Sequence, residues 1–449
     1  MDKQKLNSLG VDIPSILLPE SASADLQKWP VIACDQFTQD RDYWKKVKSA
    51  AEGKPSTINL IIPEVFLTDD DVKQRISNIH STMKNYLQDG VFAPPRQGFI
   101  YIERDTPFQK KRRGLVAAID LEQYDWQPEA RPLIRCTEGT VAERLPPRMD
   151  IRRGAPLELP HVLLLIDDDS DNLLPTLGEK VKNTAPVYST PLIMDSGHVK
   201  GWFLDNDDSS IMNFITEKLD ELFRRSIGRY DGNEKPFLFA VGDGNHSLAA
   251  AKGIWEEIKA SHTGEGLPNH PCRYALVEIE NIYDPAIKFE PIHRLVFDIG
   301  FKETVSLLSQ LPEFTCRNIN SGKELAQSCA NPASGKSAVN CFGLISEGCY
   351  ALIETSAPGI ATACLQPILD KYAGDNPLLI DYIHDEKELF RLAENKTESN
   401  RRAAGILLPP VQKSGLFETV ARLGPLPRKS FSMGHSVEKR FYLECRRIY

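Results

Sequence analysis

The residues best suited to chemistry in this sequence gather in one short stretch, Gly242-Asp-Gly-Asn-His-Ser247. The apolar residues Phe237 to Val241 precede it and predict a buried strand. Leu248-Ala-Ala-Ala-Lys252 follows and predicts a helix that Asn245 or Ser247 caps. A strand, a glycine turn and a helix N-terminus bind anions well, because free backbone N–H groups and the positive end of the helix dipole point at the ligand.

We therefore expect this turn to hold a phosphate. Gly242 and Gly244 would let a phosphate approach the main chain closely. His246 and Ser247 would supply side-chain donors, and Asp243 would act as a base or a metal ligand. The alternative is a tight turn whose polar side chains only satisfy one another, but a polar run of this kind is costly in a turn unless it is used.

Arginines form a second candidate site. Five of them fall within nineteen residues beside the turn-like sequence Thr137-Glu-Gly-Thr140, namely Arg135, Arg144, Arg148, Arg152 and Arg153. Arginine binds phosphate or carboxylate with two parallel hydrogen bonds, so the cluster predicts an anion clamp. An arginine-rich helix in solvent, with Glu138 and Glu143 as partners, is the alternative.

Further candidate groups lie at strand ends and near the C-terminus. Asp35 follows the predicted strand Val31–Cys34, which is where α/β proteins place functional groups or an ordinary helix cap. His293-Arg294 precedes an apolar strand, and Lys429 lies in a basic run that either reaches the site or covers surface. The run Asp167–Asp169 predicts either a magnesium site or a solvated loop.

Composition excludes several classes of protein. The chain has 449 residues, a net charge of −8, 41% hydrophobic and 26% charged residues, which is ordinary for a soluble globular protein. The acidic balance argues against nucleic acid or a membrane as the main partner. The nine cysteines show no metal-type spacing, and Met1–Leu6 lacks the apolar core of a signal peptide, so we expect reduced thiols and a cytoplasmic location.

The order of predicted elements indicates a mixed α/β and α+β fold with several domains. We expect an N-terminal α/β domain over residues 1–165, a central domain over 166–300 that carries the glycine turn, and a C-terminal α+β domain over 301–449. The usual phosphate-loop, dinucleotide and zinc motifs are absent from the sequence, so nucleotide binding would need another fold.

Over nearly its whole length the chain resembles the family known as domain of unknown function 1015. The resemblance is carried by seven short motifs: Ala33–Thr38, Pro55–Thr57, Arg135 with Thr137–Thr140, Glu158–His161, Gly242–Ser247, Pro291–Arg294 and Leu426–Ser430. The wider family more often has Asp-Gly-His-His-Arg at the central turn. Here Asn245 and Ser247 replace the first histidine and the arginine.

That central motif is in turn similar to the phosphate-binding motif of the ParB/sulfiredoxin fold, a group with nucleotide hydrolases, sulfiredoxin and archaeal kinases of free serine. The resemblance implies a ParB-like central unit that binds ATP or ADP with magnesium. Because Ser247 replaces the motif's arginine, Arg294, Arg152 or Lys429 would have to supply the missing charge.

We therefore expect a nucleotide-dependent phosphotransferase that acts, in either direction, on a small hydroxylated metabolite such as free serine. The expected catalytic residues are Asp35, Glu138, Asp243, His246 and His293. The expected nucleotide-binding residues are Gly242, Gly244, Asn245, Ser247, Arg135, Arg152, Arg294 and Lys429. A regulatory protein that binds a nucleotide or phosphometabolite without turnover, and a structural protein whose turn ties two domains together, are the rival functions.

Overall fold

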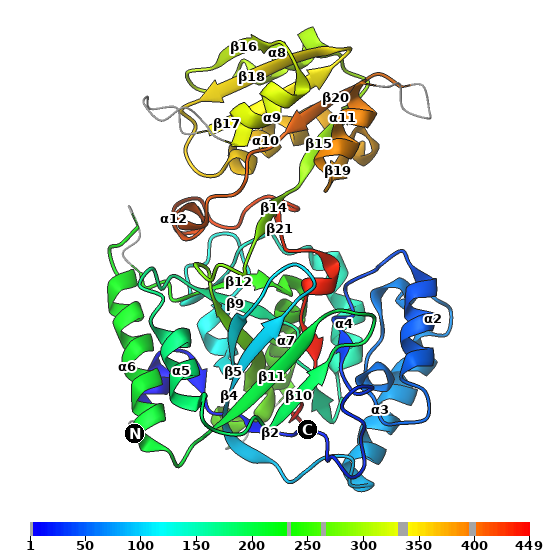
Figure 1. Ribbon diagram of the computed structural model, residues 1–449, viewed down its shortest axis with the longest axis vertical. Coiled ribbons are helices and arrows are strands. Elements are labelled where there is room, and N and C mark those ends of the chain that lie inside the picture. Colours follow the sequence, from blue (N-terminus) through cyan, green and yellow to red (C-terminus); the bar gives the residue numbers. More distant parts are fainter. Residues whose placement is uncertain (1–2, 231–234, 262–265, 331–339, 395–400) are drawn as a thin grey trace. The chain divides into compact units, whose positions relative to one another are not determined.

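A computed structural model describes residues 3–230, 235–261, 266–330, 340–394 and 401–449. Contacts within the chain divide it into two compact units, shown in Figure 1. The N-terminal unit consists of residues 1–287 and 434–449, and the C-terminal unit of residues 288–433. Both units combine helices with β-sheets, so the expected mixed α/β architecture is confirmed.

One mixed eleven-stranded sheet forms the centre of the N-terminal unit. Its main order is β10 (Tyr188–Pro191), β11 (His198–Asp205), β4 (Arg96–Asp105), β5 (Arg112–Asp120), β13 (Tyr274–Asn281), β9 (Leu163–Ile166), β12 (Phe239–Asp243), β7 (Ile134–Cys136) and β6 (Tyr124–Asp125), with β1 (Val11–Asp12) on β5 and β2 (Ser15–Ile16) on β4. Strands from residues 1–165 alternate in space with strands from 166–300. The structure therefore differs from the three-part division expected above, because these two regions share a sheet.

Helices cover both faces of this sheet (Figure 1). They are α1 (Lys3–Ser8), α2 (Arg41–Ala50), α3 (Val72–Gln88), α4 (Leu145–Arg152), α5 (Leu173–Val181), α6 (Ser209–Ser226) and α7 (Asn245–Ser261). Single 3₁₀ turns link them at η1 (Thr57–Leu60), η2 (Glu64–Phe66), η3 (Leu121–Gln123), η4 (Ala142–Arg144), η5 (Leu267–Asn269), η6 (Pro271–Arg273) and η8 (Ser436–Glu438). Apolar side chains of α5, α6 and α7 pack on one face, and those of α2 and α3 on the other.

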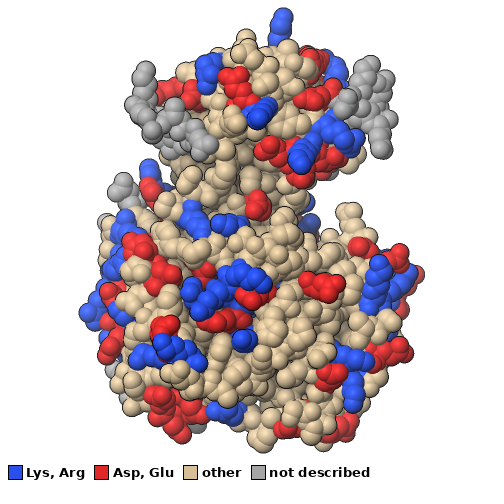
Figure 2. Space-filling view, in the orientation of Figure 1, with Lys and Arg blue, Asp and Glu red and all other residues tan. Residues whose placement is uncertain are grey.

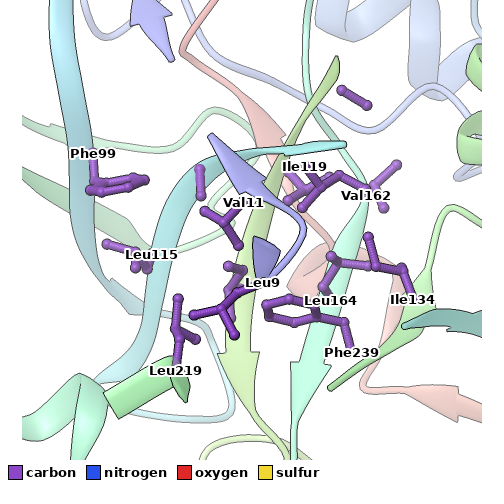
Figure 3. Packing of buried hydrophobic residues seen from close by; sticks show 14 of the residues in the cluster. Leu9, Val11, Phe99, Leu115, Ile119, Ile134, Val162, Leu164, Leu219 and Phe239 are labelled. Atoms are coloured by element: carbon purple, nitrogen blue, oxygen red, sulfur yellow. The ribbon is translucent and has the colours of Figure 1, made fainter. Parts of the chain in front are cut away.

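The alternation of side chains along the strands produces these two cores. Phe99 and Leu115 point into the core beneath α5 to α7, which Figure 3 shows, whereas Ile100 and Val116 point into the core beneath α2 and α3. All four side chains are buried. Burial on both faces explains why these strands read as continuous apolar runs in the sequence.

The last sixteen residues return to the N-terminal unit. Here β22 (Phe441–Tyr442) pairs with β3 (Val31–Ile32), and β23 (Arg446–Arg447) pairs with β8 (Leu157–Glu158). Arg440, which is buried, forms ion pairs with Glu278 of the central sheet and with Glu444. A buried charge of this kind is costly unless paired, so the tail is held in place by its own charges as well as by strand pairing.

The C-terminal unit has an antiparallel six-stranded sheet with helices on both faces. The order is β16 (Thr315–Ile319), β18 (Cys349–Thr355), β17 (Asn340–Ser346), β20 (Ala403–Leu407), β15 (His293–Phe297) and β19 (Ile380–Ile383). A second pair joins β14 (Phe289–Pro291) to β21 (Phe431–Met433). The helical segments are α8 (Phe301–Leu308), α9 (Gly322–Ala330), α10 (Ala361–Ala373), η7 (Pro377–Leu379), α11 (Glu386–Glu394) and α12 (Lys413–Leu423).

In Figure 2, basic and acidic side chains are intermixed over the face in view. Within the described part of the chain, no helix combines the length and the apolar character that crossing a membrane requires. All nine cysteines are free thiols in the structure.

Candidate functional site

The sheet brings three loops to one edge. Strand β12 runs parallel to β7, so the loop after Cys136 and the turn after Asp243 meet at the same end of the sheet. Strand β9 runs antiparallel to β12 and pairs Leu163 with Asp243, so the segment just before β9 also lies there. The register shifts between Val241 and Asp243, which places Gly242 in an irregular position of the strand. We call this edge the α7 edge.

The expected strand, glycine turn and helix are present. Gly244 has a φ of +80°, and its carbonyl accepts the hydrogen bond of the Leu248 N–H at 3.0 Å. Helix α7 therefore starts at Asn245 rather than at Leu248, and Asn245 and Ser247 occupy its first turn instead of capping it. The N–H groups of that turn have no partner inside the helix, and they carry the positive end of its dipole.

The loop after β7 packs against this helix start. Thr137 donates to the carbonyl of Val241 at 2.6 Å, and the backbone N–H of Val141 donates to Nε2 of His246 at 3.3 Å. Glu138 lies on this loop, between those two contacts. The sequence-predicted Thr-Glu-Gly-Thr and Gly-Asp-Gly-Asn-His-Ser motifs are thus brought together.

Two buried polar atoms at the α7 edge take part in no hydrogen bond among the described residues. They are Oγ1 of Thr140 and Oδ1 of Asn245. Leaving a buried polar atom unpaired costs about 1–3 kcal/mol, so such atoms are rare unless a ligand or water meets them. Both belong to the segments that the strand register places side by side.

A lysine from the C-terminal tail adds charge at the same place. The Lys439 ammonium lies 3.2 Å from Oδ2 of Asp243, while Oδ1 of Asp243 accepts the N–H of Gly244 at 3.0 Å. The Lys439 side chain is only 9% exposed. Because Asp243 is already occupied by these two donors, its role in this structure is to fix the turn and the lysine.

His161 joins three parts of the chain at this edge. Its Nε2 lies 2.8 Å from Oγ of Ser247 and 3.9 Å from Oδ2 of Asp35, and its Nδ1 lies 3.0 Å from the hydroxyl of Tyr442. The Tyr442 hydroxyl accepts the N–H of Cys34 at 3.2 Å. The two ring nitrogens of His161 thus connect Ser247 at the start of α7 with Tyr442 of the C-terminal tail.

A cavity of about 150 Å³ lies beside this chain of contacts. His161, Ser247 and Cys34 line it together with Arg148, Arg152 and mostly apolar residues. Burial raises the pKa of the Cys34 thiol to about 12, with a further contribution from Asp35, so this cysteine is a neutral wall of the cavity.

The arginines of α4 are paired with carboxylates. Arg152 donates to Glu158 at 2.6 Å, and Arg148 forms an ion pair with Glu64. Burial alone would raise the pKa of Glu158, but Arg446 and Arg152 outweigh it and hold that pKa below its ordinary value. Two arginines of the predicted clamp are thus paired with carboxylates, and these differ from Glu138 and Glu143, the partners named in the alternative.

Arg135 does not face the α7 edge, contrary to the sequence-based expectation. Its guanidinium donates to the carbonyl of Pro132 at 3.0 Å and lies over the ring of Phe237, 4.5 Å from its centroid. Phe237 precedes β12, at the opposite end of that strand from Gly244. Burial lowers the pKa of Arg135 to about 10, and its role is to hold two strand starts together.

Three other expected residues belong to the C-terminal unit and are used within it. Arg294 has no exposed surface and donates to Gln366 at 2.7 Å and to the carbonyl of Lys429 at 3.1 Å. The ring nitrogen Nδ1 of His293 accepts the N–H of Leu408 at 3.1 Å. The Lys429 ammonium lies 5.2 Å from the centroid of the Tyr382 ring. Full burial makes Arg294 a structural residue rather than a phosphate ligand.

The aspartates after β9 are also engaged. Asp168 accepts the N–H groups of Asn172 and Leu173 at the start of α5, and Asp169 pairs with Arg225 and Arg229. Across the residues that the structure describes, no group of three or more histidine, cysteine, aspartate or glutamate side chains is placed to hold a metal ion.

Sequence reasoning missed three residues of the α7 edge, namely His161, Lys439 and Tyr442. His161 was visible as the last residue of a family motif, directly before an apolar strand. Its role escaped because the antiparallel direction of β9, which turns that strand's start toward the site, cannot be deduced from one sequence. Lys439 and Tyr442 reach the site only because the tail returns to β3.

Comparisons with known proteins complete the description. Among solved structures, a conserved hypothetical protein from Pyrococcus furiosus is 12% identical, with 73% of this chain and 90% of that chain covered and a TM-score of 0.33. A free serine kinase in complex with AMP is 12% identical, with 76% and 94% covered and a TM-score of 0.36. SbnI from Staphylococcus aureus, truncated at its C-terminus, is 9% identical, with 73% and 85% covered and a TM-score of 0.36.

Similarity this weak carries no conclusion about activity. No curated protein sequence matches the chain. A family model does, and it spans most of the sequence motifs described above: with residues 18–372 matched, the chain belongs to the family described as Protein of unknown function (DUF1015).

Proposed function

We propose that this protein is a phosphotransferase that binds a nucleotide phosphate at the N-terminus of α7 and transfers it to, or takes it from, a small hydroxylated metabolite such as free serine. The observation that carries the proposal is the helix start itself. The first-turn N–H groups that follow Gly244 have no partner within the helix, and the side-chain oxygens of Asn245 and Thr140, which form no hydrogen bond among the described residues, lie on the segments that meet there. In this proposal the His246 side chain and the Lys439 ammonium, which shares its charge with Asp243, contact the phosphate.

The neighbouring cavity supports a small acceptor. Sites for drug-sized ligands usually measure about 300–1,000 Å³, and the cavity beside Ser247 measures about 150 Å³. It suits a metabolite of a few heavy atoms, with the nucleotide outside it along the α7 edge. In this arrangement the acceptor hydroxyl lies near His161 and Ser247, both of which line the cavity.

Asp35 is the proposed proton acceptor. Its Oδ1 accepts a hydrogen bond from Gln36 at 3.0 Å, and its Oδ2 points toward His161 at 3.9 Å. His161 is the proposed positioning residue, since it connects Asp35, Ser247 and Tyr442. Catalysis of phosphoryl transfer depends on placing the reactants in line and on stabilising charge, so a carboxylate, a cationic donor and oriented N–H groups form a sufficient set.

Magnesium would accompany the nucleotide and neutralise charge on its phosphates. Mg²⁺ commonly uses one or two protein carboxylates together with substrate phosphates. Glu138 fits that requirement, because it is a carboxylate on a loop of the α7 edge. The protein's own contribution is then to orient the phosphate, and the nucleotide brings the remaining ligands.

The test is a ligand screen followed by turnover. Binding of ADP and ATP, each with and without magnesium, is measured by calorimetry on the wild type and on His246→Ala. We expect binding that is lost or at least 10-fold weaker in the variant, and transfer of radioactive phosphate between ATP and serine or another small alcohol. Binding without any transfer would favour the regulatory alternative, and no nucleotide binding at all would overturn both.

A further inference from the structure

Most of the wall of the 150 Å³ cavity beside Ser247 is apolar. Ala250 and Ala251 follow Ser247 by three and four residues on α7, so the three side chains share one face of that helix and all line the cavity. Larger apolar side chains complete the wall, among them Leu60, Ile62, Met83 and Leu157. A ligand whose polar group lies near Ser247 therefore has an apolar surface one helical turn further along α7 for its aliphatic carbon atoms.

Arg152 gives this cavity a positive charge that its ion pair does not cancel. Oε2 of Glu158 accepts a hydrogen bond from Nη2 of Arg152, and Oε1 accepts one from Nε of Arg446, both at 2.6 Å. Neither arginine forms an ion pair with another carboxylate of the described residues. Two guanidinium groups thus share one carboxylate, and the three side chains together keep one positive charge. An uncompensated charge away from bulk water is costly, which favours an anionic ligand.

The Arg152 guanidinium also has unused donors. The bond to Glu158 is the side chain's hydrogen bond among the described residues, and Nε bonds to nothing there. The side chain lines the cavity and remains 16% exposed. Arg148, which also lines the cavity, differs because it has Glu64 to itself and donates to the carbonyl of Arg144 as well. Since arginine binds carboxylates through parallel hydrogen bonds, Arg152 is suited to recognise a carboxylate.

The lining offers no partner for an ammonium group. Among the described residues that line the cavity, Glu158 is the only acidic one. Besides the two arginines, it also binds the backbone N–H of Leu276 at 2.9 Å. Asp35 does not line the cavity, and the proposed function assigns it to the acceptor hydroxyl. Removing an ammonium group from water without a carboxylate partner is costly, so an amino acid should bind less tightly than a hydroxy acid with the same carbon chain.

We propose that this cavity takes a small aliphatic hydroxy acid without an ammonium group, and that Arg152 determines this specificity by binding the carboxylate. The inference rests on the proposed function, because it identifies the acceptor of that reaction, and it ranks free serine below a hydroxy acid. The acceptor hydroxyl would lie near His161 and Ser247. In the reaction its oxygen would bond to the γ-phosphorus of ATP, the bond from that phosphorus to ADP would break, and the hydroxyl proton would pass to Asp35.

The first experiment compares ligands that differ by one group. Binding of 3-hydroxybutyrate to the full chain is measured by ligand-observed NMR without nucleotide, beside threonine, which adds an ammonium group, and 2-butanol, which has a methyl group in place of the carboxylate. We expect 3-hydroxybutyrate to bind at least 10-fold more tightly than either. It should also bind about 4-fold more tightly than 3-hydroxypropionate, which lacks one methyl group. Equal affinities for 3-hydroxybutyrate and threonine, or no detectable binding of 3-hydroxybutyrate, would overturn the proposal.

A pair of variants tests the arginine. Arg152→Gln should weaken binding of 3-hydroxybutyrate about 10-fold and leave the affinity for 2-butanol within twofold, because the neutral alcohol needs no guanidinium. Arg153→Gln removes the same charge from the next residue, which pairs with Asp150 and Glu257 and does not line the cavity, so both affinities should stay unchanged. An unchanged affinity of Arg152→Gln for 3-hydroxybutyrate would overturn the role of Arg152. The comparison of ligands on the wild type holds even if Arg152→Gln fails to fold.

Turnover distinguishes failure of this inference from failure of the proposed function. A higher kcat/KM for phosphoryl transfer to 3-hydroxybutyrate than to serine would support both. Transfer to serine with the higher kcat/KM would overturn the inference and leave the phosphotransferase in place. Binding of 3-hydroxybutyrate that depends on Arg152, without transfer from ATP to any hydroxyl compound, would support the carboxylate site and overturn the proposed function.

Discussion

Two family motifs that look alike in the sequence have different surroundings in the structure. Gly242–Ser247 in the N-terminal unit and Pro291–Arg294 in the C-terminal unit each place a histidine and polar or basic groups at a strand boundary. At the first motif, the side-chain oxygen of Asn245 forms no hydrogen bond among the described residues, and Ser247 lines a cavity. At the second, Arg294 is completely buried and bonded to Gln366.

The difference lies in what surrounds each motif. The first is placed at a sheet edge where three loops and the C-terminal tail converge, which leaves room for a ligand. His293 and Arg294 of the second motif lie within β15, a strand with partners on both sides, so backbone carbonyls and core side chains satisfy their polar groups. A basic residue in a family motif therefore indicates ligand binding only where neighbouring protein groups have not already satisfied its hydrogen bonds and its charge.

The largest expected effect is on catalysis at the α7 edge. Asp35→Asn should lower the rate of phosphoryl transfer by roughly 10²–10⁴-fold, the usual contribution of a general base. The nucleotide affinity should change little, because Asp35 does not contact the α7 start. Steady-state kinetics with separate kcat and KM values measure this, and Asp42→Asn on the exposed surface is the matched control. A fall in affinity with unchanged kcat would contradict the assignment.

The C-terminal motif should respond in stability instead. Arg294→Met leaves the Gln366 oxygen and the backbone carbonyls of Ile292, His293 and Lys429 without this buried donor, at a cost of about 3 kcal/mol. Urea unfolding measures this. Arg317→Met, on the exposed edge strand β16, should stay within about 0.5 kcal/mol of the wild type. If Arg294→Met kept full stability but lost nucleotide affinity, the contrast between the two motifs would fail.

The local structure of the first motif could be predicted from the sequence, but the orientation of some of its neighbours could not. The run Phe237–Val241 followed by Gly242-Asp-Gly-Asn-His-Ser predicted the strand, the turn and the helix, since apolar period and glycine chemistry are local properties. The start of α7 was misplaced by three residues because Gly244, in the left-handed region, takes the capping position itself. Arg135 was misassigned because its sequence neighbours at Thr137–Thr140 face the site while its own side chain turns back toward Phe237.

Long-range pairing was beyond the sequence. Whether a strand's start or its end meets the site depends on its direction in the sheet, which decided the role of His161. Lys439 is separated from Asp243 by the whole C-terminal unit along the chain. No local pattern links residues so far apart, and their joint position becomes visible only in three dimensions.

A pH experiment should sharpen the comparison between the two units. Burial, with help from Arg294 and His384, lowers the pKa of His293 from 6.5 to about 4. The unfolded chain then binds a proton more readily than the folded chain between these values, so the C-terminal unit should lose on the order of 2 kcal/mol as the pH falls from 6.5 to 4. Above pH 6.5 this contribution is complete and constant.

Glu158 in the N-terminal unit has a different window. The pKa of buried Glu158 lies below its ordinary 4.5, so its contribution is lost only when the pH falls below 4.5. Hydrogen exchange followed by mass spectrometry at pH 6.5, 5.5 and 4.5 resolves peptides of each unit. We expect the slope of stability with pH in residues 288–433 to flatten in His293→Leu. An identical slope in the wild type and the variant would show that His293 is not the group that titrates.

The smallest expected effect on stability and affinity concerns Gly244, whose backbone conformation, rather than a side chain, shapes the turn. A Cβ at this position would lie 3.0 Å from Cγ2 and 3.1 Å from Cα of Val162, at a φ of +80°. Gly228 has a similar φ of +72°, but a Cβ there meets nothing within 4 Å.

A left-handed backbone conformation costs an L-residue about 1–2 kcal/mol. The free energy of unfolding should therefore fall by about 1 kcal/mol in both Gly244→Ala and Gly228→Ala. The free energy of unfolding of Gly244→Ala should fall by about 1 kcal/mol more. The new Cβ would meet the main chain of Val162, which can move only together with the start of β9. Since that shift displaces His161 next to it, Gly244→Ala should also weaken nucleotide binding, while Gly228→Ala should not. Equal stability and equal affinity in the two variants would mean that the turn is not held against Val162, and that the position of His161 does not depend on it.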